Sequence, residues 1–141
     1  MLRMWALPSL YLLAMIAIAF WPVPVDSSAG PALASSLNWL HAHGVPAFVD
    51  YGFVEFSANI LFFIPLGIFL GMGLGRFWIA AIVGIVASAL IELGQLLFLP
   101  NRFATLSDVA ANSLGAALGT AIWMAAYGTH LKRKARKASA V

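Results

Sequence analysis

Seven polar side chains in the sequence have the types and spacing to form a binding or catalytic site. Six of them form three pairs at helical spacing, so the two members of each pair share one helix face. The pairs are Glu55 with Asn59, Glu92 with Gln95, and Asp108 with Asn112, and the seventh residue is Arg102. Glu92 and Asp108 are candidate catalytic residues, because two carboxyl groups can divide the acid and base roles of a reaction. The planar guanidinium group of Arg102 can bind a phosphate or carboxylate of a ligand, or it can neutralise Glu92 or Asp108.

The segments that must position these side chains are apolar. Of the 141 residues, 62% are hydrophobic and 9% are charged, against roughly 25% charged in average soluble proteins. The mean hydropathy of +0.93 predicts apolar surface patches larger than a soluble monomer keeps in water. The sequence contains no cysteine, which excludes a disulfide scaffold, and no sustained polar tract, which excludes a disordered tail. The composition therefore predicts an integral membrane protein.

Four apolar stretches, at about residues 6–25, 53–74, 77–99 and 109–127, are each near the length of a membrane-spanning helix. About 20 residues are needed to cross roughly 30 Å of hydrocarbon. The stretches are rich in Leu, Ala and Ile and lack the alternation of barrel strands. We predict an all-α integral membrane protein with a four-transmembrane-helix bundle. Residues 1–127 form a single transmembrane domain, and residues 128–141 form a basic tail.

The distribution of Lys and Arg predicts the orientation of the bundle. With the N-terminus in the cytoplasm, Arg3, Arg76 and the five basic residues from Lys132 to Lys137 lie inside, and Arg102 alone lies outside. We therefore expect both termini in the cytoplasm. The tail can also contact anionic lipids, but it is too short for nucleic-acid binding.

A cleaved signal peptide is the alternative interpretation of the first stretch. Arg3 would supply its basic region, and Ser27-Ser28-Ala29 its cleavage site. The apolar run from Leu10 to Trp21, extended on both sides, favours a retained helix.

The long outer loop between the first two stretches contains a short helical pattern. Leu33, Leu37 and Leu40 recur at helical spacing and Gly44 follows as a stop, so we predict an interfacial helix here. His41 and His43 lie two residues apart, which directs their rings to different sides of a helix. No cysteine or third histidine lies beside them, so we predict no metal site. We interpret them as solvated residues at the membrane interface.

The polar residues inside the spans converge on the outer half of the bundle. A charged group at the helix centre costs roughly 2.5 kcal/mol or more on insertion scales, so each needs a partner or a function. Glu92 lies about seven residues before the outer end of the third span, or roughly 10 Å deep at helical rise. We therefore predict a polar pocket open to the outer face. For Asp108 a structural role is the alternative, as a carboxylate in the first helical turn behind Ser107 as the cap.

Ordered sequence blocks resemble the VanZ-like family of bacterial membrane proteins. They are Asn59-Ile-Leu-Phe-Phe-Ile-Pro-Leu-Gly67, Ile91-Glu-Leu-Gly-Gln95, Arg102 with Asp108 six residues later, and Asn112-Ser-Leu-Gly115. The resemblance covers about residues 53–123. It implies a location in the bacterial cytoplasmic (inner) membrane and a link to resistance against the glycopeptide teicoplanin, as in the founding member.

One loop departs from the family pattern. Where the family often has Phe-Asp-Ile-Asp-Asp, this chain has Ala104-Thr-Leu-Ser-Asp108, and only the last carboxylate remains. The departure argues against a high-affinity divalent cation site, which needs more oxygen ligands.

Small residues recur at four-residue spacing at Gly67, Gly71 and Gly75, and again at Ala111, Gly115 and Gly119. Such repeats let helix backbones approach closely in lipid. We interpret them as packing surfaces within the chain. A homodimer face is the alternative.

Two main classes of function fit these residues, and a purely structural subunit is a third option. The first is a non-catalytic protein whose outer pocket binds a lipid headgroup, a cell-wall precursor or a lipoglycopeptide, with membrane lipids around it and no cofactor. The second is an intramembrane enzyme acting on a lipid-linked anion, with Arg102 on the phosphate and Glu92 and Asp108 as acid and base. We favour the first, because no activated nucleophile or histidine base is expected at the outer face.

Overall fold

The computed structural model describes residues 2–22, 29–100 and 105–138, with side chains described for 5–22, 29–100 and 105–130. Within these ranges the chain forms five helices and no strand: α1 (Leu2–Ala19), α2 (Gly30–Ala42), α3 (Tyr51–Leu74), α4 (Phe77–Phe98) and α5 (Leu106–Ala138). The prediction of an all-α protein is confirmed. The helix predicted around Leu33 to Leu40 is also present, as α2, and Gly44 follows it with a φ of 93°.

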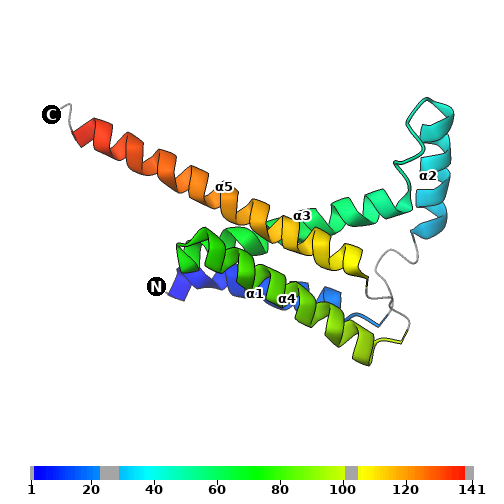
Figure 1. Ribbon diagram of the computed structural model, residues 1–141, viewed down its shortest axis with the longest axis horizontal. Helices are drawn as coiled ribbons and strands as arrows, with labels where there is room; N and C mark the ends of the chain where they lie inside the picture. The colour runs from blue at the N-terminus through cyan, green and yellow to red at the C-terminus, as the bar shows by residue number, and fades with distance from the viewer. Residues whose placement is uncertain (1, 23–28, 101–104, 139–141) are drawn as a thin grey trace.

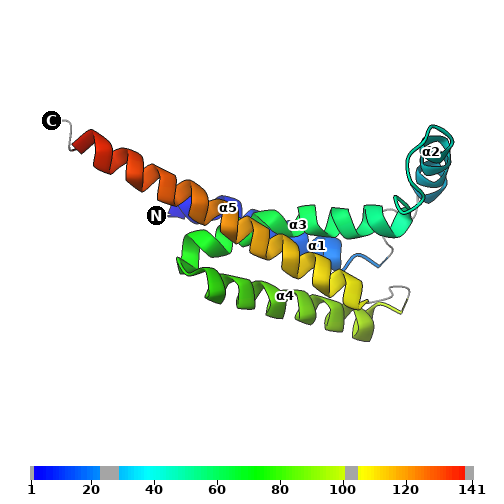
Figure 2. The same ribbon diagram turned by 45° about the horizontal axis from the view of Figure 1, so that its top comes forward.

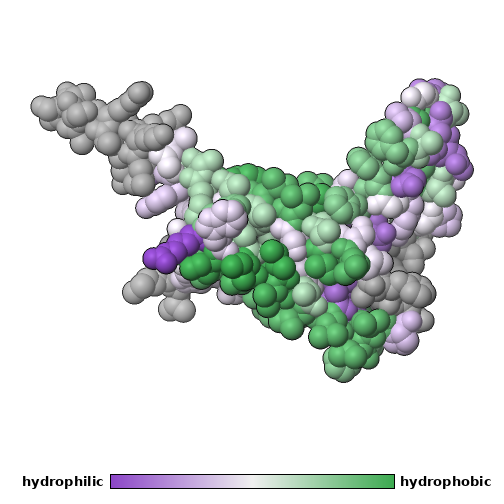
Figure 3. All heavy atoms as spheres, in the orientation of Figure 1, coloured by the Kyte–Doolittle hydropathy of each residue, from purple (hydrophilic) through white to green (hydrophobic). Residues whose placement is uncertain are grey.

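Three helices are long and apolar enough to cross a membrane: α3, α4 and α5 from Leu106 to His130. The apolar part of α1, Trp5–Ala19, is shorter. Figure 3 shows a broad hydrophobic face over the bundle, with hydrophilic residues towards α2 and at the opposite end. The described part of the chain thus supports a membrane protein with three spans by length and composition.

The first predicted span differs from the helix observed. It was expected to reach residue 25, whereas α1 ends at Ala19, and residues 23–28 lie outside the described part of the chain. Prolines at 22 and 24 explain the early end, because the residue before a proline disfavours the helical conformation. The proposed cleavage site also falls mostly within residues 23–28.

Local sequence explains the other helix boundaries. The Asp50 carboxylate caps α3 by accepting from the backbone N–H of Phe53 at 2.9 Å. Gly75 ends the same helix with a φ of 63°, a left-handed conformation that glycine adopts without strain. α5 continues beyond residue 127 because its Ala, Lys and Arg residues are good helix formers.

α5 packs between α3 and α4, and α1 lies against the bundle (Figures 1 and 2). The Tyr11 hydroxyl of α1 donates a hydrogen bond to the backbone carbonyl of Phe62 in α3. Met15 joins Phe63, Leu66 and Ala116 in a small apolar core. The core is small because much of the remaining apolar surface faces outwards, as expected for helices in lipid.

The closest helix contact is the small-residue interface between α3 and α5, formed by Gly67, Gly115, Ala116, Gly119 and Thr120. A Cβ atom on Gly119 would lie 2.0 Å from the carbonyl oxygen of Ile64, and one on Gly67 would lie 2.0 Å from that of Ala116. Thr120 donates to the carbonyl oxygen of Gly67 at 3.0 Å. The predicted packing of small residues within the chain is confirmed for Gly67, Gly71, Gly115 and Gly119, which leaves these glycines unavailable for the alternative homodimer face. It is wrong for Gly75, where a Cβ would meet nothing within 4 Å.

The two ends of the bundle carry different segments (Figure 1). The start of α1, the α3–α4 turn at Arg76 and the far end of α5 lie at one end, which we call the Arg76 end. The end of α4, the start of α5 and the projecting helix α2 lie at the other, the α2 end. This arrangement sets which polar residues can meet.

Candidate functional site

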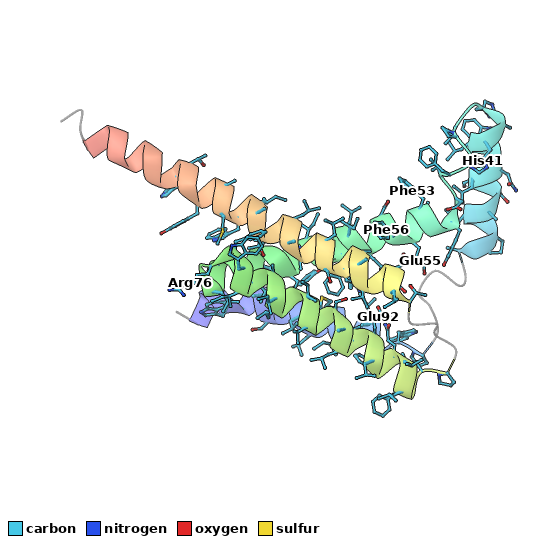
Figure 4. All side chains as sticks on the ribbon, in the orientation of Figure 1. His41, Phe53, Glu55, Phe56, Arg76 and Glu92 are labelled. Carbon is cyan, nitrogen blue, oxygen red and sulfur yellow. The ribbon has the colours of Figure 1, made fainter. Side chains whose placement is uncertain are left out.

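The predicted site residues that the structure describes lie in the half of the bundle towards the α2 end. Figure 4 shows Glu55 on α3 and Glu92 on α4 at this end, with Arg76 at the opposite one. The polar layer is the set of side chains that these helices bring together there: Asn59, Ser88, Glu92, Gln95, Asp108 and Asn112. Three hydrogen bonds within this layer each join a different pair of helices.

The first bond joins α3 to α5. The amide nitrogen of Asn59 donates to Asp108 Oδ1 at 2.8 Å. The other carboxylate oxygen, Oδ2, accepts from the hydroxyl of Thr105 at 2.7 Å, and the Thr105 oxygen accepts from the backbone N–H of Asp108 at 3.1 Å. Asp108 therefore has the structural role considered for it, since it lies in the first turn of α5, and it also holds a side chain of α3.

The capping residue is Thr105, and the expectation that Ser107 would cap this helix was wrong. α5 begins at Leu106, one residue earlier than Ser107, so Ser107 lies inside the first turn. Thr105 then occupies the position from which a hydroxyl reaches the third backbone N–H of the helix.

The second bond joins α5 to α4 in the bundle interior. The amide nitrogen of Asn112 donates to Glu92 Oε1 over 3.5 Å, a long hydrogen bond. Glu92 is 8% exposed and Asn112 is 4% exposed. A carboxylate at this depth makes the α4–α5 contact polar, in contrast to the small-residue interface of α5 with α3.

The third bond joins α4 to α1. The amide nitrogen of Gln95 donates to the backbone carbonyl oxygen of Ala19 at 2.9 Å. Ala19 is the last residue of α1, where a helix leaves carbonyl groups without partners in its own turns. Gln95 thus serves as a side-chain cap for a helix 76 residues away in the sequence.

The remaining two of the seven predicted residues are Glu55 and Arg102. Glu55 is exposed on α3, one turn before Asn59. Because Asn59 already pairs with Asp108 in the first turn of α5, the preceding turn of α3 extends past the start of α5. Arg102 lies outside the described residues, so its predicted contacts with Glu92 or Asp108 stay predictions.

Sequence reasoning missed Ser88, which lies one turn before Glu92 on the same buried face of α4 and is fully buried. Extending the Glu92–Gln95 face by one turn would have found it. Ser88 Oγ and Asn112 Oδ1 have no hydrogen-bond partner among the described residues. The polar layer therefore retains hydrogen-bonding capacity that the described side chains do not use.

The two histidines at the end of α2, His41 in its last turn and His43 just after it, have separate partners. The Nε2 atom of His41 donates to the Val49 carbonyl oxygen at 3.1 Å, and Nδ1 of His43 donates to that of Trp39 at 2.7 Å. The His43 ring also stacks on Trp39, with ring centroids 4.0 Å apart. Within the described ranges, no group of three or more His, Cys, Asp or Glu side chains is placed to hold a metal ion.

Comparison with known proteins identifies one relationship. The family model described as VanZ/LLP1 matches residues 9–127, which extends from α1 through most of α5 and includes the whole polar layer. No curated protein and no solved structure matches the chain.

Proposed function

Because the chain belongs to the VanZ/LLP1 family, we propose that it is a four-span inner-membrane protein whose polar layer binds an envelope ligand without catalysing a reaction. The ligand is an anionic lipid headgroup, a lipid-linked cell-wall precursor or a lipoglycopeptide. By binding it, the protein alters exposure of the envelope to antibiotics of the teicoplanin type. The observation that carries the proposal is the buried layer of polar side chains at the α2 end.

α1 supplies the fourth span in this proposal. Its 18 residues extend about 27 Å at helical rise, close to the hydrocarbon thickness. Two side-chain bonds to neighbouring helices, from Tyr11 and to Ala19, support its place in the bundle.

α2 is the interfacial helix of this proposal. Trp39 and Phe48, on and just after it, are 60% and 68% exposed, and aromatic side chains of this kind favour the headgroup region. Its projection from the bundle supports a position at the outer surface (Figure 1).

The Arg76 end faces the cytoplasm in this proposal, with both chain termini. The excess of basic residues at that end supports this orientation. The chain has no cysteine, so single-cysteine variants can test it cleanly. We expect an impermeant thiol reagent added to intact cells to label Ser35→Cys and Asn101→Cys but neither Arg76→Cys nor Ala140→Cys. Labelling of Ala140→Cys from outside would reject the four-span topology.

A binding role fits Asp108 better than an acid–base role. Its two carboxylate oxygens already accept from Asn59 and Thr105. An enzyme would instead need Asp108 to exchange a proton with substrate, which requires breaking these bonds. In the binding role Asp108 positions the start of α5, and Arg102 supplies the charge that attracts an anion.

The proposal is tested with purified protein in lipid nanodiscs and labelled polyprenyl phosphate, followed by mass analysis of the lipid. We expect saturable binding without turnover, and at least tenfold weaker binding by Arg102→Gln or Glu92→Gln. Thr129→Ala, at an exposed position near the Arg76 end, is the control. Turnover of the lipid would support the intramembrane enzyme, and unsaturable partitioning would reject both functions.

Coupling between Arg102 and the carboxylates gives a second test. Arg102→Gln combined with Glu92→Gln or Asp108→Asn should weaken binding much less than the two single effects added together. Strict additivity in both cycles would mean that Arg102 does not share a site with the polar layer.

A further inference from the structure

Acidic and basic residues are divided between the two ends of the bundle. The acidic residues of the sequence are Asp26, Asp50, Glu55, Glu92 and Asp108. None occurs in residues 2–19, 56–91 or 109–138, which include every segment at the Arg76 end. That end holds seven of the eight Lys and Arg residues, five of them between Lys132 and Lys137. Its positive charges therefore have no acidic side chain of the same chain to neutralise them.

Exposed aromatic side chains mark the membrane boundary at the Arg76 end. They come from three different helices: Trp5, Trp78 and Tyr127. A Cβ on Gly73 of α3 would lie 3.3 Å from the Trp5 ring. Tyr127 stacks on Trp123, and a Cβ on Gly71 would lie 2.9 Å from that indole. Trp and Tyr favour the boundary between hydrocarbon and headgroups, so the membrane-embedded part of α5 ends near Tyr127.

α5 continues past this boundary as one helix, which carries the basic residues into the headgroup region. At helical rise, Lys132 lies about 8 Å beyond Tyr127 along the axis, and Lys137 about 15 Å beyond it. The headgroup layer adds roughly 5–8 Å on each side of the hydrocarbon core. These axial distances are upper limits on height above the membrane, because α5 slopes away from the other helices (Figures 1 and 2). The first basic residue is thus level with the phosphates, and the last lies about one Debye length, roughly 8 Å, beyond them.

We propose that residues 132–137 of α5, the basic segment, bind anionic phospholipid headgroups of the adjacent leaflet. Each Lys or Arg near an anionic membrane surface contributes to binding, and this segment has five in six positions. Arginine can bind a phosphate through two parallel hydrogen bonds, and lysine binds it as a point charge. The basic segment lies at the opposite end from the polar layer, so this proposal does not depend on the proposed function.

Lipid phosphates have an advantage over soluble anions. The basic segment is the direct continuation of a membrane-spanning helix, so the headgroups are held beside it at a high effective concentration. A soluble acidic protein has to reach the same charges from solution. The charge complement therefore favours the membrane surface as the partner.

The test measures which lipids the purified full-length protein retains. The protein is placed in mixed micelles with equal amounts of phosphatidylglycerol and phosphatidylcholine, and native mass spectrometry counts the bound lipids. We expect a preference of roughly fivefold or more for phosphatidylglycerol at low ionic strength. The preference should fall as ammonium acetate is raised, because salt screens exposed charges.

A variant with glutamine at all five basic positions is the diagnostic one: Lys132→Gln, Arg133→Gln, Lys134→Gln, Arg136→Gln and Lys137→Gln. It should retain the two lipids equally and melt at the temperature of the parent protein. Ala135→Gln with Ala138→Gln is the matched control, because it adds glutamine without removing charge. Arg133→Lys with Arg136→Lys preserves the charge, and both control variants should keep most of the preference.

A second measurement places the basic segment relative to the membrane. The chain has no cysteine, so Ala138→Cys can be labelled at one site with an environment-sensitive fluorophore. In nanodiscs of phosphatidylglycerol we expect its emission to shift to the blue relative to phosphatidylcholine nanodiscs. The five glutamine substitutions should abolish this shift. A segment that serves only to fix the topology would give the same emission in both lipids.

Other outcomes overturn the proposal. Equal retention of the two lipids by the parent protein would mean that the basic segment does not bind anionic headgroups. A full preference in the five-glutamine variant would place the lipid at another basic group, such as Arg76. Binding of soluble polyglutamate without a lipid preference would assign the segment to an acidic protein. The proposed function fails separately, because loss of polyprenyl phosphate binding in Glu92→Gln leaves the phosphatidylglycerol preference unchanged.

Discussion

α5 packs against its two main neighbours in opposite ways. Against α3 it presents the small-residue interface, where Gly115 and Gly119 bring the two backbones close together. Against α4, nearer the α2 end, it presents Asn112 to the buried carboxylate of Glu92. The first contact has no spare space, and the second has oxygen atoms without partners among the described residues. The two contacts therefore differ mainly towards the α2 end, since nearer the middle of α4 Gly84 also approaches Ala116 closely.

The largest effect is expected from Gly119→Ala, which breaks the small-residue interface. The new Cβ would lie 2.0 Å from the Ile64 carbonyl oxygen, so the two backbones must separate. We expect a loss of about 3 kcal/mol or more, at the upper end of the usual cost of overpacking. Thermal unfolding in detergent measures it.

Gly128→Ala is the matched control on the same helix, because a Cβ there meets nothing within 4 Å. It should be neutral or stabilising by up to about 1 kcal/mol through helix propensity. Equal destabilisation by the two substitutions would show that close packing at Gly119 is not what holds α5.

The next effect is expected from Gln95→Leu, which removes the bond from α4 to the end of α1. The Ala19 carbonyl loses its donor, and we expect a loss of about 1–3 kcal/mol. Hydrogen–deuterium exchange should rise in the last turn of α1 and stay unchanged in α3. As the control, Leu96→Ala at the exposed neighbouring position should leave the exchange rate in α1 unchanged. If Gln95→Leu also left that rate unchanged, Gln95 would not be the cap of α1.

A smaller effect is expected from the bond between Asn59 and Asp108. A double-mutant cycle of Asn59→Ala and Asp108→Ala should give a coupling energy of about 1 kcal/mol, measured by chemical unfolding. Asn59→Ala paired with Thr129→Ala, at a distant exposed position, should be additive. Coupling in the second cycle but not the first would contradict the contact.

The smallest effect is expected from Tyr11→Phe in α1. The substitution removes the hydroxyl that bonds to the Phe62 carbonyl but keeps the ring contacts with Phe62 and Phe69. We expect a loss of about 0.5–1.5 kcal/mol. The exposed Tyr127, changed to Phe, should have no effect on the melting temperature, and a similar loss in both variants would argue against a specific bond at Tyr11.

Features that repeat along the chain could be predicted from the sequence. Helical spacing placed Glu92 and Gln95 on one face, and both are buried. The four-residue spacing of Gly115 and Gly119 indicated close helix contacts, which the structure contains. These predictions succeed because periodicity depends only on helix geometry.

Features that depend on how helices meet could not be predicted. Gln95 bonds to a backbone carbonyl of α1, and no side-chain pattern identifies such a partner. Glu55 has the same spacing from Asn59 as Asp108 has from Asn112, yet it is exposed because α3 extends past the start of α5. The end of α1 at Ala19 depended on prolines whose effect a hydropathy pattern does not register.

The length of α5 has a mechanical consequence. Its 33 residues extend about 50 Å at helical rise, well beyond the roughly 30 Å of a bilayer core. It is held closely to α3 at Gly115 and Gly119, and its far end projects from the bundle without another helix beside it (Figure 2). Its contacts extend from Asp108 to Trp123, so about the first half of the helix is held and the rest moves with it as one rigid rod. A displacement of α5 at the α2 end is thereby carried along the helix to the Arg76 end.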